Sequence, residues 1–248
     1  MTRTIAFFTD FGSQDIYVGQ LHAAAKKTGS DCPLVDLFHD VNSFDIHAGA
    51  SLLAAMLDYL PHNAIVVGVV DPGVGGTRLP IAVELGERWL VGPDNGLFSR
   101  SVAWSTSEAQ YWTLETPIDV AKTFHGRDVF LPAALELASG GLERIHQAED
   151  VSDISTHRDA KEIKNDDHRV IHVDHYGNLI SGIRGAAIGT HQTVEIAGRV
   201  LPHADYFERV PAGECFWYVN SIGLLEISAN QASAARALNV KGGAEIAV

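Results

Sequence analysis

The stretch VVDPGVGGTR, Val69 to Arg78, places a carboxylate and a guanidinium at the two ends of a glycine-rich loop. Asp71 follows a β-branched run, residues 64–70, so it falls at the carboxyl end of a strand, where open α/β sheets bind ligands. A phosphate loop would need Lys and then Ser or Thr ahead of a helix, but Thr77 and Arg78 lead into another strand. The loop is therefore either part of an active site or a glycine turn in which Asp71 bonds the backbone.

Other polar residues recur at the ends of predicted strands. Asp10 closes the first strand, and Asp15 stands five residues later, just ahead of a predicted helix. Asp94 and Asn95 follow another strand in LVGPDNG, and TFHGRD places His125 where a helix opens. Taken singly, each has an ordinary explanation: Asp15 as an N-cap, the other strand-end residues as turn formers, His125 as a cap or core histidine. Several polar strand ends in one sheet favour a shared cleft.

Composition limits the class of protein. The chain has 248 residues, a formal net charge of -13 and no block of Lys or Arg, so nucleic acid and anionic membranes are not expected partners. Cys32 and Cys215 are the only cysteines, which disfavours a disulfide framework or a zinc site and favours a reducing cytoplasm. The apolar run near the N-terminus is too short for a signal peptide, and no segment approaches the ~18 apolar residues of a membrane span.

The elements that must position these residues fall into two regions. Residues 1–150 alternate short apolar runs with helical periodicity, which predicts an α/β domain with a mostly parallel sheet. Its predicted strands are TIAFF, PLVDLF and AIVVGVV, with a helix over 48–60 and a hairpin from PIAVEL and RWLVG. Residues 151–167 are charged and read as an exposed linker. Residues 168–248 hold short strands and one predicted helix, 231–238, which indicates a small all-β domain.

Six motifs in order resemble one known family. TDFGSQDIYVG, VVDPGVGGTR, PDNG, FHGRDVF, DHYGN and NSIGLLEI are similar to the S-adenosylmethionine hydroxide adenosyltransferases, relatives of the fluorinating and chlorinating enzymes. The resemblance implies that water attacks ribose C5′ of S-adenosylmethionine, giving adenosine and methionine, with no cofactor or metal. It also implies an N-terminal α/β domain, a C-terminal β-barrel-like domain and a homotrimer with each site between neighbouring subunits.

The family's catalytic residues fall on Asp71, Arg78 and His125 by this resemblance. The halogenating relatives carry an aromatic residue where Asp71 stands and lack the histidine, so the sequence resembles the hydrolases at these positions. The chemistry is consistent: water gains from a base that polarises it, a task that Asp71 and His125 could share, and Arg78 could fold back to hold the carboxylate by a charge-assisted pair.

The resemblance also implies a set of substrate-binding residues: Asp10, Asp15, Phe44, Asn95, Asp174, Tyr176, Asn178, Ser221 and Glu226. Asp10 would bind the ribose hydroxyls, and Asp15 and Asp174 would face the methionine ammonium. Asn178 would read the adenine edge. Phe44 occupies the place of a Trp that stacks on adenine in the halogenating relatives, although ordinary packing would also explain a Phe. Ile222 departs from the Arg of those relatives, which leaves recognition of the methionine carboxylate open.

Two other classes of function stay open on the residues alone. A metal-dependent phosphohydrolase could use Asp10, Asp15, Asp71 and Asp94 to hold Mg²⁺ or Mn²⁺, although the first-strand motif has no basic residue for a phosphate. A non-catalytic protein could instead bind S-adenosylmethionine or adenosine without turning it over. Chelator sensitivity would favour the first alternative, and retention of intact ligand on prolonged incubation would favour the second.

Overall fold

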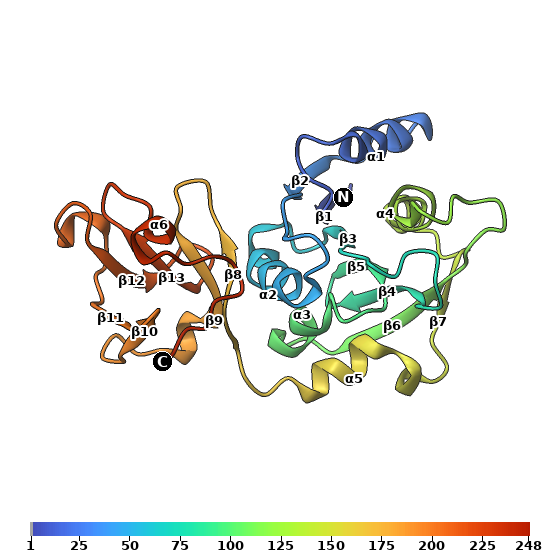
Figure 1. The fold of residues 1–248 in the computed structure, drawn as a ribbon. Coiled ribbons are helices and arrows are strands. Elements are labelled where there is room, and N and C mark those ends of the chain that lie inside the picture. The colour runs from blue at the N-terminus through green and yellow to red at the C-terminus, as the bar shows by residue number, and fades with distance from the viewer. Residues whose placement is uncertain (1) are drawn as a thin grey trace. The chain divides into compact units, whose positions relative to one another are not determined.

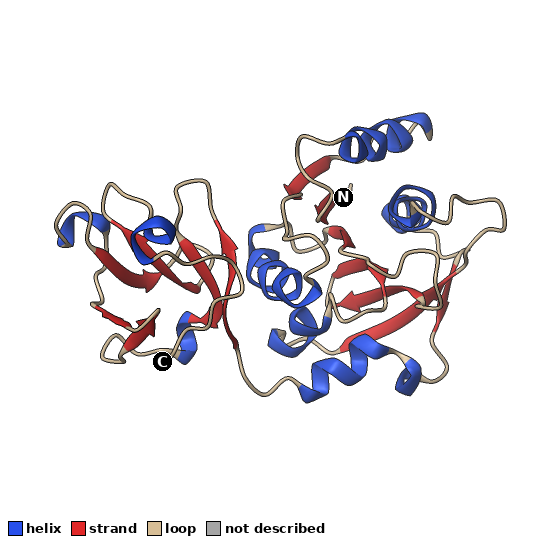
Figure 2. Cartoon of the chain, viewed as in Figure 1, coloured by secondary structure: helices blue, strands red, loops and turns tan. Residues whose placement is uncertain are grey.

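The structure, a computed structural model, describes residues 2–248. The chain divides into two compact units, one ending at Ile163 and one covering Lys164–Val248. Helices and strands alternate in the first unit, whereas strands dominate the second (Figure 2). Within the described residues, no helix is long and apolar enough to cross a membrane.

The N-terminal unit is built on one seven-stranded sheet with the order β2-β1-β3-β5-β4-β6-β7 (Figure 1). The strands are β1 (Ile5–Thr9), β2 (Leu34–Phe38), β3 (Ile65–Val69), β4 (Pro80–Leu85), β5 (Arg88–Pro93), β6 (Ala109–Leu114) and β7 (Ile145–Gln147). β2, β1, β3 and β5 pair in parallel, and the antiparallel pairs β5-β4, β4-β6 and β6-β7 complete the sheet. Only β4 and β7 therefore run against the other strands, which confirms the predicted α/β fold and the β4-β5 hairpin.

Helices cover both faces of this sheet, as Figure 1 shows. They are α1 (Ile16–Lys27), α2 (Ile46–Met56), α3 (Ser99–Trp104), α4 (Leu131–Ser139) and α5 (Ser155–Glu162). α1 and α4 pack together on one face, while α2, α3 and α5 form the other layer. β1 and β3 are buried along their whole length because both of their faces are covered, which explains their continuous apolar sequences.

The C-terminal unit is all-β apart from short helical turns and α6 (Ala234–Leu238), as predicted. A four-stranded antiparallel sheet contains β12 (Cys215–Val219), β13 (Leu224–Ala229), β9 (Leu179–Arg184) and β8 (Asp167–Val173), and a ribbon contains β10 (Val194–Ile196) and β11 (Arg199–Leu201). Bridges from Arg169 to Glu245, from Glu195 to Ala247 and from His203 to Trp217 join the two sheets. Pairing thus continues around the unit, which gives the expected barrel-like character.

The segment expected as an exposed linker, residues 151–167, contains the helix α5. Ile154 and Thr156 are buried there, and α5 packs on α3. The polar composition of the segment reflects a helix with one covered side, because its charged side chains lie on the remaining surface. A helical pattern was hidden by the scarcity of large apolar residues.

Candidate active site

Two neighbouring parallel strands bring Asp10 and Asp71 to one edge of the sheet. Thr9 of β1 is in register with Val69 of β3, and the Asp10 amide donates to the Val69 carbonyl over 3.2 Å. Asp10 and Asp71 both line a cavity of about 300 Å³, together with Phe44 and His125. Two of the polar strand-end residues, Asp10 and Asp71, thus share one cavity of the N-terminal unit with His125.

The three predicted catalytic residues are in direct contact. Arg78 Nη2 donates to Asp71 Oδ2 over 2.6 Å, and Arg78 Nε lies 3.1 Å from Oδ2 and 3.3 Å from Oδ1. The same Nη2 lies 2.9 Å from His125 Nδ1. The Asp71 side chain is 3% exposed and that of Arg78 is 10% exposed, so the pair is largely screened from water. The glycine loop thus folds Arg78 back onto the acid that precedes it.

The contact with Arg78 fixes the tautomer of His125. A guanidinium only donates hydrogen bonds, so Nδ1 accepts and the proton of the neutral ring lies on Nε2. Burial, together with the Arg78 charge, lowers the pKa of His125, which keeps the ring neutral. His125 immediately precedes a π-helical turn, Gly126–Phe130, that leads into α4. The predicted helix is present, with a widened first turn beside the site.

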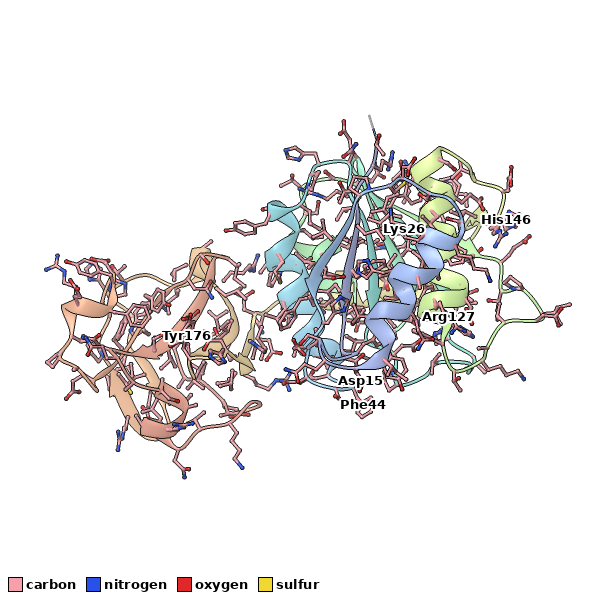
Figure 3. All side chains as sticks on the ribbon, turned by 90° about the horizontal axis from the view of Figure 1, so that it is seen from above. Asp15, Lys26, Phe44, Arg127, His146 and Tyr176 are labelled. Carbon is pink, nitrogen blue, oxygen red and sulfur yellow. The ribbon has the colours of Figure 1, made fainter. Side chains whose placement is uncertain are left out.

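Asp10 and Phe44 are linked through the backbone. The Phe44 amide donates to Asp10 Oδ2 over 3.0 Å, and Phe44 has a positive φ of 68°, a conformation that few residues other than glycine adopt. The Phe44 ring is 72% exposed and is directed outward from the N-terminal unit in Figure 3. Core packing therefore does not account for Phe44, and its ring is available to stack on a ligand. Burial raises the pKa of Asp10, and the nearby Asp71 adds to this effect.

Sequence reasoning missed the aromatic wall of the cavity. Phe11, Tyr17 and Phe124 line it, and their ring centroids lie 5.5 to 5.7 Å apart, the spacing of edge-to-face and tilted pairs. All three lie within or next to the motifs that carry the acidic and imidazole groups. The signal was present in the aromatic residues of TDFGSQDIY and TFHG, but an apolar residue beside a strand end usually reads as core.

Three further polar residues of this unit, Asp15, Asp94 and Asn95, have structural partners. Asp15 is the N-cap of α1, where Oδ1 accepts from the Ile16 amide over 2.6 Å, and Figure 3 shows it at the start of that helix. Asp94 accepts from the first two amides of α5 over 2.7 and 2.8 Å. Asn95 Nδ2 donates to the Val70 carbonyl over 2.8 Å, beside the glycine loop. None of the three is among the described residues that line the 300 Å³ cavity.

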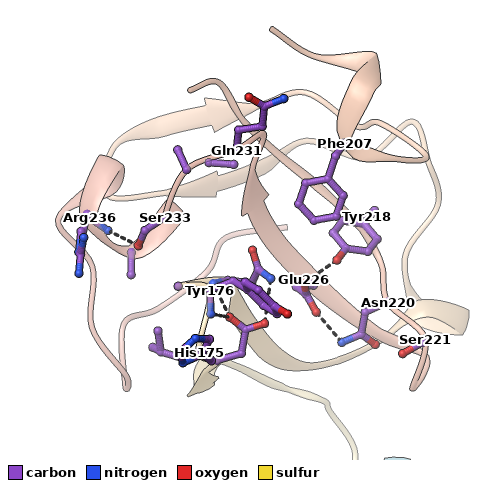
Figure 4. Close-up of a pocket in the computed structure, with 17 residues that line it drawn as sticks. His175, Tyr176, Phe207, Tyr218, Asn220, Ser221, Glu226, Gln231, Ser233 and Arg236 are labelled. Carbon is purple, nitrogen blue, oxygen red and sulfur yellow. Dashed lines mark hydrogen bonds between the residues drawn. The ribbon is translucent and has the colours of Figure 1, made fainter. Parts of the chain in front are cut away.

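The five predicted substrate-binding residues of the C-terminal unit line one larger cavity, of about 1080 Å³: Asp174, Tyr176, Asn178, Ser221 and Glu226. Figure 4 shows its wall, including Phe207, Tyr218, Gln231 and Arg236, which the sequence did not indicate. The cavity thus offers amide, carboxylate and aromatic groups in one hollow, a mixture suited to a small polar ligand with a flat ring.

The two carboxylates of this cavity are held by neighbouring donors. Asp174 accepts from the Tyr176 amide over 2.9 Å and from the Asn178 amide and side chain, each over 2.8 Å. Glu226 accepts from the Tyr218 hydroxyl and from Asn220 Nδ2, as the dashed lines of Figure 4 mark. These bonds orient both groups before any ligand arrives. Tyr176 is 76% exposed, which leaves its ring free to cover a ligand.

The carboxylates that a metal-dependent phosphohydrolase would use as metal ligands have other partners. Asp94 holds the start of α5, Asp71 pairs with Arg78, and Asp15 caps α1. Across residues 2–248, no three His, Cys, Asp or Glu side chains form a group that could hold a metal ion. The carboxylates at the strand ends are therefore arranged around a guanidinium and a backbone amide, and their geometry does not suit Mg²⁺ or Mn²⁺.

Comparison with known proteins identifies the family. Residues 5–147 match the model of the SAM hydroxide adenosyltransferase N-terminal domain, and residues 168–247 match that of its C-terminal domain. The chain belongs to the SAM hydroxide adenosyltransferase family. Because the two models cover most of the chain, both units described above are parts of one family architecture.

Individual relatives agree with this family. An (R)-S-adenosyl-L-methionine hydrolase of Thermus thermophilus is 36% identical, with 97% of each chain covered. A crystal structure of a conserved hypothetical protein, also from Thermus thermophilus, has 33% identity and a TM-score of 0.77, with 98% of each chain covered. A fluorinase of Actinopolyspora mzabensis is only 23% identical over 98% of this chain and 96% of its own. The chain thus resembles the hydrolase more closely than the fluorinase.

Proposed function

We propose that this protein hydrolyses S-adenosyl-L-methionine by attack of water at ribose C5′, giving adenosine and L-methionine. The observation that carries the proposal is that Arg78 contacts both Asp71 and His125, which line one cavity together with Asp10 and Phe44. The relatives named (R)-S-adenosyl-L-methionine hydrolase support this reaction. We extend the stereochemistry given in the names of these relatives to this chain and propose the (R) sulfonium epimer as substrate.

Asp71 has the geometry of the water-orienting group. Its Oδ2 is held by two Arg78 nitrogens, whereas Oδ1 has only the longer contact of 3.3 Å and keeps lone pairs for a water. The oxygen of water forms the bond to C5′, the C5′–S bond breaks with its electron pair going to sulfur, and one proton of water passes to Asp71 Oδ1. Arg78 holds the carboxylate still, which places the water without further reorganisation.

His125 contributes a second fixed group. Its Nδ1 accepts from Arg78, so Nε2–H is the end of the ring that is available to a water or a ribose oxygen. A neutral ring also adds no positive charge beside a sulfonium substrate, and burial maintains that neutrality by lowering the pKa of His125. We propose that His125 orients the nucleophile together with Asp71.

The remaining residues bind the parts of the substrate that do not react. The sulfonium loses its charge as the C–S bond breaks, so a carboxylate beside sulfur would favour the substrate over the transition state. We propose that Asp10 binds the ribose hydroxyls and that Phe44 stacks on adenine. Asp15, Asn95, Asp174, Tyr176, Asn178, Ser221 and Glu226 are proposed as the other substrate-binding residues.

We propose a homotrimer in which neighbouring subunits complete each site. Support comes from the division of the proposed binding residues between a cavity in the N-terminal unit and a cavity in the C-terminal unit. Light scattering should give the mass of three chains, and full activity in a monomer would contradict the proposal.

Cytoplasmic location is proposed because Cys32 and Cys215 are both free thiols.

The decisive experiment is incubation of the pure protein with each sulfonium epimer in ¹⁸O-labelled water. Chromatography and mass spectrometry should find methionine and adenosine with the label on the 5′-oxygen, with the (R) epimer consumed faster. Full activity in EDTA is expected. Unlabelled adenosine, or activity abolished by the chelator, would overturn this mechanism, and intact substrate after long incubation would favour a binding protein.

A further inference from the structure

The N-terminal unit has a second cavity, which borders the proposed catalytic residues on the side of Arg78. It has a volume of about 340 Å³, and its lining includes Gly75, Arg78, Thr116, Val120, Lys122 and His125. Of these two cavities, Asp71 lines the 300 Å³ one, Arg78 lines the second one, and His125 lines both. The hydrogen-bonded groups of Asp71, Arg78 and His125 therefore form a wall between two separate hollows.

The second cavity opens to solvent along the segment that follows β6. Thr116 is an exposed residue on its lining, and Ile118 beside it is 98% exposed. Its lining includes the polar residues Arg78, Lys122 and Thr116, and its volume is large enough for several waters. This cavity thus extends from the exposed segment after β6 to the Arg78 and His125 side of the proposed catalytic groups.

The proposed reaction needs such a space. In an in-line displacement, water approaches C5′ from the side opposite the sulfur, so the nucleophile must lie on the far side of C5′ from the departing methionine. A ligand that fills a cavity of about 300 Å³ leaves little room for water to pass beside it. Each turnover also consumes one water and releases one proton, so both need a path between the proposed catalytic groups and solvent.

We propose that the second cavity supplies the nucleophilic water and receives the released proton. This inference rests on the proposed hydrolysis. Water passes the wall beside His125, the one residue of the wall that borders both spaces, and reaches the free lone pairs of Asp71 Oδ1. After attack, the proton taken up by Asp71 returns through the same wall to solvent. Thr116 and Val120 line the second cavity and are not among the residues that line the 300 Å³ cavity.

A reversible plug tests this route. Thr116→Cys is made in a chain whose Cys32 and Cys215 are replaced by Ser, and it is labelled with benzyl methanethiosulfonate, which dithiothreitol removes. Asp119→Cys, an exposed position on the same segment that does not line the cavity, is the matched control. Val120→Cys is labelled in parallel as a second plug. Adenosine formation by the reduced variants measures the hydrolysis itself.

We expect labelled Thr116→Cys to lose at least about tenfold in kcat, since water then has no direct path to the proposed base. Adenosine affinity by calorimetry and the shape of the pH profile should stay unchanged, because the wall itself is intact. Dithiothreitol should restore kcat, and labelled Asp119→Cys should stay within about twofold of its reduced form.

Full activity of both labelled plugs would overturn the water route while leaving the hydrolysis standing. Loss of adenosine binding or a shifted pH profile on labelling would also overturn it, since the label would then be acting on the wall or the first cavity. If no reduced variant forms adenosine, and neither does the unmodified enzyme, the proposed function itself fails. The two failures are therefore distinguishable.

Discussion

The buried contact between Asp71 and Arg78 should make the N-terminal unit sensitive to loss of either partner. Asp71→Ala leaves a guanidinium that is 10% exposed with His125 Nδ1 and the Phe130 ring as its remaining neighbours, the ring 5.3 Å from Arg78 Cζ. Removing one partner of a buried ion pair typically costs about 3–5 kcal/mol. We expect Asp71→Ala and Arg78→Ala each to lower the free energy of unfolding by an amount in this range.

The double variant supplies the test of coupling. Because Asp71→Ala/Arg78→Ala leaves no unpaired charge, its loss should fall short of the sum of the single losses by at least about 1.5 kcal/mol. Urea unfolding followed by tryptophan fluorescence measures all three variants. The control is Asp58→Ala, which removes a 91% exposed carboxylate 3.7 Å from Arg88 and should cost under about 1 kcal/mol. Additive losses, or single losses no larger than the control, would refute the buried pair.

The same variants have catalytic consequences, and other positions extend them. Asp71→Ala should lower kcat at least about 10²-fold with adenosine affinity little changed, whereas Asp10→Ala should weaken adenosine binding by about 1.5–3 kcal/mol in calorimetry; the reverse result would exchange the two roles. Because the pKa of His125 is lowered, its ring stays neutral below the ordinary pKa of 6.5. We therefore expect kcat at saturating substrate to stay constant to below pH 6.5 and to fall only on further acidification. A fall in kcat that begins above pH 6.5 would contradict a neutral His125. Gly75 has a φ of 74°, and Gly75→Ala places a Cβ 2.4 Å from the Lys122 carbonyl oxygen. This variant should lower the free energy of unfolding in urea by at least about 1–2 kcal/mol. Gly29→Ala, which has a similar φ but open space around the Cβ, is the control for backbone strain alone.

Much of the fold follows from patterns that are local in the sequence. Continuous apolar runs identified β1 and β3 because both faces of those strands are covered. The contact of Asp71 with Arg78 could also be predicted from the sequence, because a glycine loop at a strand end limits the positions open to the residue seven places after Asp71. Bringing His125 to that pair required the family resemblance, since the chain offers no local pattern that relates positions 47 residues apart.

Asp94 shows why local patterns do not separate site residues from structural ones. Asp94 and Asp71 both follow buried strands and precede glycines, yet Asp94 accepts from the Ser155 and Thr156 amides, about 60 residues away in the chain. Its partner helix was itself missed, because α5 is short and carries few large apolar residues. The second cavity could not be predicted from the sequence either, since its lining forms only when the loop at Gly75 meets the segment around Lys122.

The capping of α5 by Asp94 has a practical consequence for dividing the protein. A fragment cut at residue 147, where the match to the N-terminal family model ends, would lose both amides that satisfy a carboxylate only 6% exposed. Each charge-assisted hydrogen bond of this kind contributes about 1.5–3 kcal/mol. The shortened fragment would therefore carry an unsatisfied buried carboxylate at the carboxyl end of β5. An autonomous N-terminal fragment should therefore extend through Ile163, and it should resist proteolysis at sites where the shorter one is cleaved.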